Sequence, residues 1–331
     1  MTLTSDVPVR NSAGGTELQL TVAETIALTP AVRHVRLVDP AGPTLPSFTP
    51  GSHIVVTCGT GPGGRPRRNS YSLTGPAFEP DHYAISVRLE ESGRGGSQWV
   101  HDLQVGDRVP VGTPRSAFAP ILTARHHLLV AGGIGITPIL SHVRAAVQWG
   151  RSFEVHYAFR DGDGAHLDEL HDLCGPRLYI YTAREVFRKR MGQALLEQPI
   201  GTHLYMCGPT GLVDDLCERA GRAGWPDARV HYEHFRVGDL DPGEPFTAHL
   251  TRRVIDVTVD SGVSLLDALE SRGVAVPNLC RQGVCGECRL PVMSGGIDHR
   301  DLYLSAAEKE AGDCVMPCVS RANGPRLELD L

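Results

Sequence analysis

Short runs of apolar and β-branched residues dominate the first third of the chain, and glycine or proline separates each run from the next. Their alternation with polar positions predicts strands over residues 18–28, 32–37, 54–58 and 83–89. Helical spacing is weak until residues 97–103. Strands this short and this closely spaced predict a small antiparallel barrel or sandwich.

The pattern changes near residue 125, where apolar strands begin to alternate with helical stretches. Strands are predicted at 127–131, 153–159, 178–182 and 203–206, and helices at 139–149, 167–173 and 209–223. Strands that alternate with helices predict a parallel sheet with helices over its faces.

A segment rich in Gly, Pro and Asp, residues 236–246, has little to bury and is interpreted as a linker. After it, strands are predicted at 248–250 and 253–259 and a helix at 264–272. The pattern therefore predicts a multidomain chain, divided into a flexible N-terminus at 1–15, a β-barrel at 16–122, an α/β domain at 123–235 and a third domain at 247–331.

Composition and charge narrow the class of protein. The 331 residues carry a formal net charge of −6 without a basic stripe, which argues against a nucleic-acid partner. There is no run of eighteen apolar residues and no signal-peptide pattern, so we expect a cytoplasmic protein without a membrane segment. Nine cysteines without a secretion signal favour a metal or cluster site over a disulfide framework.

Three cysteines stand close together near the C-terminus. Cys280, Cys285 and Cys288 have the spacing C-x4-C-x2-C, which with one distant cysteine is typical of plant-type [2Fe–2S] ligands. Gly283 and Gly286 supply backbone conformations that a Cβ would forbid. A structural zinc site is the alternative, but zinc favours two C-x2-C pairs or added histidines. Cys314 and Cys318 are both candidates for the fourth ligand.

Two segments of the β-rich third suit a cofactor that carries a phosphate. Residues 67–74 read RRNSYSLT, in which an arginine can bind phosphate and Tyr71 can pack on a flavin ring. An exposed basic hairpin is an equally good interpretation of this segment alone. Residues 93–97 read GRGGS and precede a predicted helix with Ser97 as its cap, where backbone N–H groups favour an anion.

Two segments of the α/β third suit a dinucleotide. Residues 132–138 read GGIGITP, follow a strand and open a helix, so the backbone can approach a pyrophosphate. Residues 206–209 read MCGP and end another strand at the sheet edge where α/β proteins bind ligands. Alone, the first could be a tight strand-to-helix turn, and Cys207 could be a buried core thiol.

With these segments in this order, the chain resembles the phthalate dioxygenase reductase family within the ferredoxin–NADP reductase superfamily. The resemblance covers nearly the whole chain. It implies an antiparallel β-barrel flavin domain, an α/β parallel-sheet nicotinamide domain and an α+β plant-type ferredoxin (β-grasp) domain. It also implies FMN rather than FAD, NADH rather than NADPH and a [2Fe–2S] cluster; the sequence itself leaves FAD and NADPH open.

The function that the resemblance implies is that of a monomeric reductase component. Such a protein passes electrons from NADH to a terminal Rieske-type oxygenase that hydroxylates aromatic rings or removes O-methyl groups. A cytochrome P450 or another monooxygenase is an alternative acceptor. A non-catalytic redox-sensing or electron-transfer subunit is a further alternative, against which the two complete nicotinamide segments argue.

The resemblance also assigns residues. Residues 317–321 resemble the closing segment of plant-type ferredoxins, which implies Cys318 as the fourth ligand beside Cys280, Cys285 and Cys288. Thr137, Cys207 and Glu233 are expected at the reacting end of the nicotinamide. The expected cofactor contacts are Arg68, Tyr71, Ser72, Leu73, Val87, Arg88, Gly95, Gly96, Ser97, Gly132, Gly133, Gly135, Thr137, Pro138, Arg160, Cys207, Gly208, Pro209 and Phe235.

Two of these assignments keep an alternative. The family motif places its arginine two residues before the tyrosine, whereas Arg68 stands three before Tyr71, so Arg67 is also a candidate. Arg160 could contact the adenosine end of the nucleotide or lie in a solvated loop.

Overall fold

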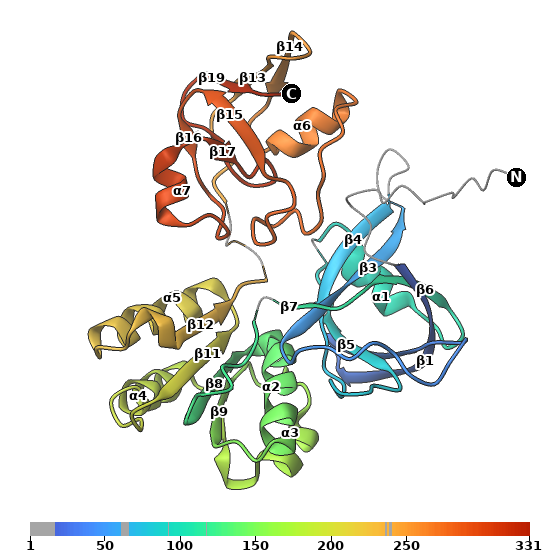
Figure 1. The fold of residues 1–331 in the computed structure, drawn as a ribbon, viewed down its shortest axis with the longest axis vertical. Coiled ribbons are helices and arrows are strands. Elements are labelled where there is room, and N and C mark those ends of the chain that lie inside the picture. The colour runs from blue at the N-terminus through green and yellow to red at the C-terminus, as the bar shows by residue number, and fades with distance from the viewer. Residues whose placement is uncertain (1–16, 61–65, 92, 117, 236, 238–239) are drawn as a thin grey trace, which may run out of the picture. The chain divides into compact units, whose positions relative to one another are not determined.

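The computed structural model of the chain describes residues 17–60, 66–91, 93–116, 118–235, 237 and 240–331. The segment predicted as a flexible N-terminus, 1–15, lies outside the described residues. By its internal contacts the chain divides into two units, residues 1–120 with 140–149, and residues 121–139 with 150–331. The three main sheets, which Figure 1 labels, are described one at a time.

The first sheet is antiparallel and closes on itself. Its strands run in the order β4-β3-β6-β1-β2-β5, with β7 paired to β3, and a bridge between Leu73 and Ile85 joins the two ends. Ile54, Val56 and Cys58 alternate along β3 into a fully buried core. The predicted antiparallel barrel is therefore confirmed. Its elements are β1 (Glu17–Thr29), β2 (Val32–Val38), β3 (Ser52–Thr60), β4 (Pro66–Ser72), β5 (Tyr83–Arg88), α1 (Gly96–Asp102), β6 (Arg108–Gly112) and β7 (Arg115–Ser116).

The second sheet is parallel throughout, in the order β10-β9-β8-β11-β12. Figure 1 shows α3 on the side of this sheet opposite to α4 and α5. The predicted α/β architecture is confirmed. Its elements are β8 (His126–Gly132), η2 (Gly133–Gly135), α2 (Ile136–Gln148), β9 (Phe153–Ala158), α3 (Leu167–Cys174), β10 (Leu178–Tyr181), α4 (Arg184–Ala194), β11 (Thr202–Cys207), α5 (Thr210–Arg222) and β12 (Val230–Glu233).

The third sheet is mixed, in the order β14-β13-β19-β15-β17. Its middle strands β13 and β19 are parallel and the other pairs are antiparallel, as expected of a ferredoxin-like domain. Leu265 and Leu269 of α6 are fully buried in the core under this sheet. The elements of this domain, in which β16 and β18 form a separate two-stranded sheet, are β13 (Phe246–Leu250), β14 (Ile255–Val259), α6 (Leu265–Ser271), β15 (Leu290–Ser294), β16 (Ile297–Asp298), α7 (Ala306–Ala311), β17 (Cys314–Val315), β18 (Arg321–Ala322) and β19 (Arg326–Leu329).

The predicted linker, 236–246, is tied to the third domain wherever it is described. Val237 is buried with that domain's core, and its N–H donates to the Gln282 carbonyl oxygen over 3.2 Å. The Arg321 guanidinium donates to the Glu244 carbonyl oxygen over 3.0 Å. Among the described residues, no helix combines the length and the apolar character needed to cross a bilayer.

Candidate functional site

The four cysteines predicted as ligands form two close pairs. The Cys288 Sγ donates to the Cys318 Sγ over 3.4 Å, and the Cys280 and Cys285 thiols are hydrogen-bonded to each other. Within the described part of the chain, no three His, Cys, Asp or Glu residues surround a single metal position. Two pairs of thiols fit a binuclear cluster, because each iron of a [2Fe–2S] centre takes two cysteine ligands.

Backbone N–H groups of the cluster loop, residues 280–288, stabilise negative charge on the sulfurs. The Gln282 N–H donates to the Cys280 Sγ over 3.3 Å. The hydrogen bond from the Cys285 thiol, followed by the N–H groups of Val284 and Gln282, lowers the pKa of Cys280 to about 6. The hydrogen bond with the Cys288 thiol, followed by burial, raises the pKa of Cys318, and the Gly283 N–H only partly offsets this rise. A loop that already directs donors at thiolates suits a cluster held by anionic sulfur.

The two glycines of the cluster loop are required where they stand. Gly283 has φ 74° and Gly286 has φ 77°, both in the left-handed region. A Cβ on Gly283 would lie 2.7 Å from Val319 Cγ2, and one on Gly286 would lie 2.2 Å from Cζ of the Tyr303 ring. The prediction that a Cβ is excluded at both glycines is confirmed.

Arg281 takes the same left-handed conformation without being glycine, at φ 54°. Its guanidinium donates to the Asn278 Oδ1 over 2.9 Å and to Asp267 of α6 over 2.8 Å, and it also pairs with Glu270. These contacts anchor the cluster loop to α6 and offset the conformational cost.

The structure distinguishes the two candidates for the fourth ligand. Cys318 pairs with Cys288, whereas Cys314 lies in β17 opposite Pro291, with its thiol beside the Arg289 guanidinium. Only Cys318 therefore completes the second pair.

Strand alternation separates the two arginines that precede Tyr71. Arg67, Asn69 and Tyr71 share one face of β4, and Arg68 lies on the other face and is exposed. A Cβ on Gly95 would lie 3.3 Å from the Arg67 Nη1, and one on Gly96 would lie 2.1 Å from the Asn69 Nδ2. The structure thus brings Arg67, rather than Arg68, to the glycine turn.

The expectation that Ser97 caps the following helix is wrong. The N-cap of α1 is Gly95, which takes φ 84° because it lacks a Cβ, and no side chain caps the helix. Ser97 lies inside the first turn, where its Oγ accepts from the Glu90 N–H over 3.0 Å.

The other predicted flavin contacts lie around the same strands. Ser72, Leu73 and Val87 are buried, and Arg88 ends β5.

The two glycine-containing segments of the parallel sheet touch backbone to backbone. A Cβ on Gly135 would lie 2.2 Å from the Cys207 carbonyl oxygen, and one on Gly208 would lie 3.0 Å from the Gly132 Cα. Thr137 is buried and its Oγ1 donates to the Ile134 carbonyl oxygen over 3.1 Å. Gly133 has φ 53°, and Pro138 and Pro209 lie at the starts of α2 and α5. The two predicted nicotinamide segments therefore form one structural unit.

Cys207 and Glu233 meet at the carboxyl edge of this sheet, as neighbours in register on β11 and β12. Burial, together with the nearby Glu233 charge, raises the pKa of the fully buried Cys207 thiol. Burial raises the pKa of Glu233 to about 7, and its Oε2 has no hydrogen-bond partner within the described residues. The residue as a whole remains partly exposed, so the carboxyl group is buried at a surface edge.

Neither Phe235 nor Arg160, the last two predicted cofactor contacts, is fully buried. Phe235 is half-buried just beyond the end of β12. Arg160 is exposed in a turn after β9, in which the Asp163 N–H donates to the Arg160 carbonyl oxygen over 2.8 Å. An exposed loop position fits both interpretations of Arg160.

Sequence reasoning missed Asp301 and Tyr303, which contact the cluster loop and its surroundings. Asp301 is almost fully buried, and the Tyr303 ring lies against Gly286. The signal that could have found Asp301 is its place at the start of the short segment that leads to Ser305, which begins a capping box with Glu308 at the start of α7.

Comparisons with known proteins agree with this geometry. Residues 113–230 match the family model for the dimethylamine monooxygenase subunit DmmA-like N-terminal domain, and residues 249–323 match that for the 2Fe-2S iron-sulfur cluster binding domain. The chain is 42% identical to the heme-dependent oxidative N-demethylase beta subunit of Ectopseudomonas mendocina (strain ymp), over 96% of this chain and 99% of that protein.

Two further comparisons concern one kind of protein. The chain is 36% identical to the phthalate dioxygenase reductase of Burkholderia cepacia, over 95% of this chain and 97% of that one. A solved structure of phthalate dioxygenase reductase, described as modular for electron transfer from pyridine nucleotides to [2Fe-2S], is 34% identical. It superposes with a TM-score of 0.77 over 95% of this chain and 98% of that chain.

Proposed function

The chain belongs to the phthalate dioxygenase reductase family, and on that premise we propose that it carries electrons from NADH through FMN and a [2Fe–2S] cluster to a separate oxygenase. The observation that carries the proposal is the pairing of four thiols, three from the cluster loop and one from Cys318, with backbone N–H groups of the loop directed at the Cys280 sulfur. The same chain holds a glycine-lined sheet edge suited to a dinucleotide.

The barrel residues fit a flavin phosphate. Arg67 and Asn69 reach the turn at Gly95 and Gly96 from the face of β4 that also carries Tyr71. We propose Arg67 as the phosphate-binding cation, Asn69 as a neutral donor beside it and Tyr71 as the ring that packs on the flavin. FMN is favoured over FAD through the family.

The parallel-sheet residues fit the nicotinamide. Gly132, Gly135 and Gly208 let the two nicotinamide segments pack backbone to backbone at the edge where Cys207 and Glu233 stand. When bound, the cofactors supply the hydride and single-electron chemistry. The Cys207 and Glu233 side chains would therefore orient the nicotinamide and exclude water from it, and would not react themselves. A charged Glu233 would also stabilise positive charge on the oxidised nicotinamide ring.

A Rieske-type oxygenase is the acceptor that the family favours. A heme-containing oxygenase is a second candidate, because the heme-dependent relative is 42% identical to this chain and the phthalate dioxygenase reductase is 36% identical. Mixing the NADH-reduced protein with one purified oxygenase of each kind in a stopped-flow instrument separates them. The true acceptor is reduced in an early, saturable phase, and the other is reduced slowly.

The test of the main proposal is the visible spectrum of the purified protein, with chromatography of the released flavin. We expect flavin bands with a broad red-brown shoulder, release of FMN, and NADH-dependent reduction of cytochrome c. A protein that shows neither chromophore after reconstitution with iron, sulfide and flavin would contradict the proposal. Release of FAD would keep the electron path and change only the flavin.

A further inference from the structure

We infer that Asp301 is a positioning residue, which holds the Tyr303 ring over the cluster loop and so limits the access of water to the cluster. The inference rests on the proposed [2Fe–2S] site. It concerns two residues that bind no cofactor and that lie outside the ligand segments.

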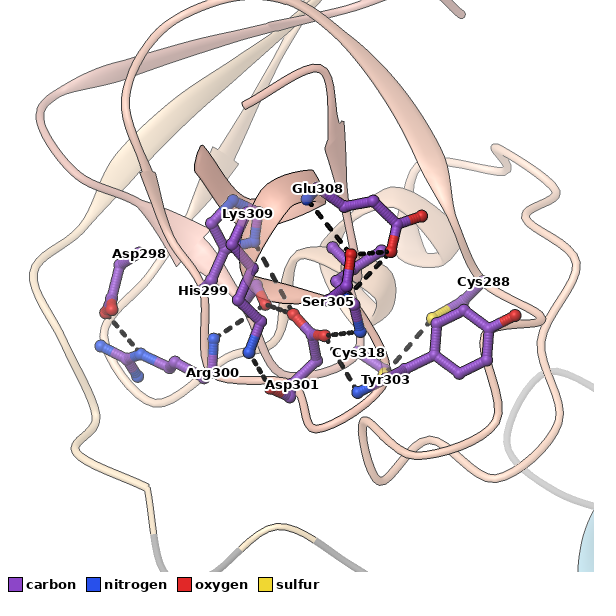
Figure 2. Close-up of polar contacts among 12 residues, drawn as sticks. Cys288, Asp298, His299, Arg300, Asp301, Tyr303, Ser305, Glu308, Lys309 and Cys318 are labelled. Atoms are coloured by element: carbon purple, nitrogen blue, oxygen red, sulfur yellow. Dashed lines mark hydrogen bonds and ion pairs between the residues drawn. The ribbon is translucent and has the colours of Figure 1, made fainter. Parts of the chain in front are cut away.

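Asp301 is a buried carboxylate with several donors around it (Figure 2). Its side chain is fully buried. The Oδ2 accepts from the N–H groups of Tyr303 and Leu304, over 3.2 and 2.8 Å, and the Oδ1 accepts from the Ser320 hydroxyl over 3.2 Å. The Lys309 Nζ donates to the Asp301 carbonyl oxygen over 2.6 Å. A buried carboxylate with this many donors fixes the turn that it begins.

This turn is joined to both segments that carry cysteines. The Leu302 N–H donates to the carbonyl oxygen of Gly283, between Cys280 and Cys285, over 2.9 Å. Ser320, the partner of the Asp301 Oδ1, lies two residues after Cys318. The turn that the Asp301 carboxylate fixes therefore connects the cluster loop, through the Leu302 N–H, with the segment that closes it, through Ser320.

The turn also places the Tyr303 ring on the cluster loop. The position of a Cβ on Gly286 would be 2.2 Å from the ring Cζ, so the ring lies directly on the peptide between Cys285 and Cys288. The residue is 49% exposed, which leaves the other side of the ring to solvent. Tyr303 is thus a cover over the loop, and its backbone N–H is held by Asp301.

A ring that covers the cluster loop lowers the solvent exposure of the cluster and so affects its midpoint potential. The potential of an iron–sulfur cluster depends on its solvent exposure and on hydrogen bonds to its sulfurs. The reduced cluster carries one more negative charge than the oxidised one, so water stabilises the reduced form more. Removing the cover should therefore move the midpoint potential to more positive values and open the irons to chelators.

The test compares Tyr303→Ala, Tyr303→Phe, Asp301→Asn and Asp301→Ala in the full-length holoprotein. Met293→Ala, at an exposed apolar position of β15, is the matched control. The readouts are the cluster midpoint potential, followed by absorbance and electron paramagnetic resonance, and the rate of bleaching by a chelator. Loss of a supporting contact typically weakens metal binding 10–100-fold, so we expect about tenfold faster bleaching in Tyr303→Ala and Asp301→Ala.

The matched variants decide between explanations. Tyr303→Phe and Met293→Ala should behave as the unaltered protein, and Asp301→Asn, which keeps one acceptor oxygen, should change less than Asp301→Ala. An unchanged potential and bleaching rate in Tyr303→Ala would overturn the inference, as would Tyr303→Phe behaving like Tyr303→Ala. If Asp301→Ala does not fold, Asp301→Asn and the tyrosine pair still decide. An unaltered protein without a cluster would overturn both this inference and the proposed function, whereas a normal cluster with unmoved variants would overturn this inference alone.

Discussion

Arg67 and Arg68 are neighbours in the sequence but lie on opposite faces of β4. Only Arg67 shares a face with Tyr71 and reaches the turn at Gly95. The choice between the two arginines is therefore made by the two-residue period of the strand, not by the distance to the tyrosine along the chain.

Replacing Arg67 by alanine should weaken flavin binding, and replacing Arg68 should not. A hydrogen bond to a charged group contributes about 1.5–3 kcal/mol, so the flavin dissociation constant of Arg67→Ala should rise by about tenfold or more. Titration of the flavin-free protein, followed by flavin fluorescence, measures this constant. Equal losses in Arg67→Ala and Arg68→Ala would remove the distinction between the two faces.

Glu233 should make flavin reduction by NADH depend on pH. Burial raises the pKa of its carboxyl group to about 7, so the carboxylate forms as the pH rises through neutrality. Because the carboxylate favours the positively charged oxidised nicotinamide, the reduction rate should rise across this range. Stopped-flow reduction between pH 6 and 8, about one unit either side of the pKa, should show a flat profile in Glu233→Gln. If Glu233→Gln keeps the pH dependence of the reduction rate, another titrating group is responsible for that dependence.

At the scale of elements, three strands of the parallel sheet begin with histidines on one face. The His203 Nδ1 lies 2.9 Å from the His231 Nε2, and Tyr205 stacks on both His127 and His231. Burial, then the neighbouring His203, His126 and Arg151, lowers the pKa of His127 to about 4. Burial also lowers the pKa values of His203 and His231. These strand starts are therefore built around neutral imidazoles.

Acid should destabilise the parallel sheet through these histidines. Their pKa values are lower in the folded than in the unfolded chain, so the unfolded chain binds more protons below about pH 6.5. The free energy of unfolding should fall as the pH drops from about 6.5 to about 4, with His127 contributing on the order of 1–2 kcal/mol. Urea unfolding across this range should show a shallower fall in His127→Phe. His171→Phe, at an exposed position of α3, is the control and should keep the full fall.

The sequence predicted the apolar strands of the parallel sheet from their local signals, and the elements that it missed include the shortest strands, which are defined by distant contacts. The strands 127–131 and 203–206 were recognisable because, after an initial histidine, each is continuously apolar, as is typical of parallel strands buried on both faces. Strands such as β17 (Cys314–Val315) and β18 (Arg321–Ala322) have two residues each and exist only through their partners β15 and β16.

The same division holds for the candidate site. The cysteine spacing and the glycines at 283 and 286 are local signals, and both were predicted. The positions of Arg67, Asp301 and Tyr303 depend on which strand or loop lies opposite each residue, and local patterns do not contain that information. Ser97 shows that a local signal can also mislead. Serine is a good capping residue, but the structure places Gly95, with its left-handed φ, at the N-cap of α1.

At the scale of the whole molecule, each sheet carries a separate step of the proposed electron path. The thiol pairs lie in the C-terminal domain, and the glycine-lined edge lies in the parallel sheet. Loss of the cluster should therefore leave the earlier steps in place.

Replacing Cys318 by serine should separate these steps. The variant should lose NADH-dependent reduction of cytochrome c, because we expect that acceptor to take its electrons from the cluster. Reduction of ferricyanide, which we expect to take its electrons from the flavin, should stay within about twofold of the unaltered rate, since distant sites are independent. Cys314→Ser is the matched control and should retain both activities. Loss of both activities in Cys318→Ser would mean that the domains do not work independently.

The pairing of the thiols also bears on how the protein must be matured and stored. The sulfurs of Cys288 and Cys318 are 3.4 Å apart, and a disulfide needs about 2.0 Å, so a small movement would join them. In a chain that lacks its cluster, dioxygen could take two electrons and two protons from each pair and leave disulfides in place of ligands. The cluster must therefore be assembled from iron and sulfide before the thiols meet dioxygen. A bleached preparation would regain its colour on reconstitution only after a thiol reductant has reduced both disulfides.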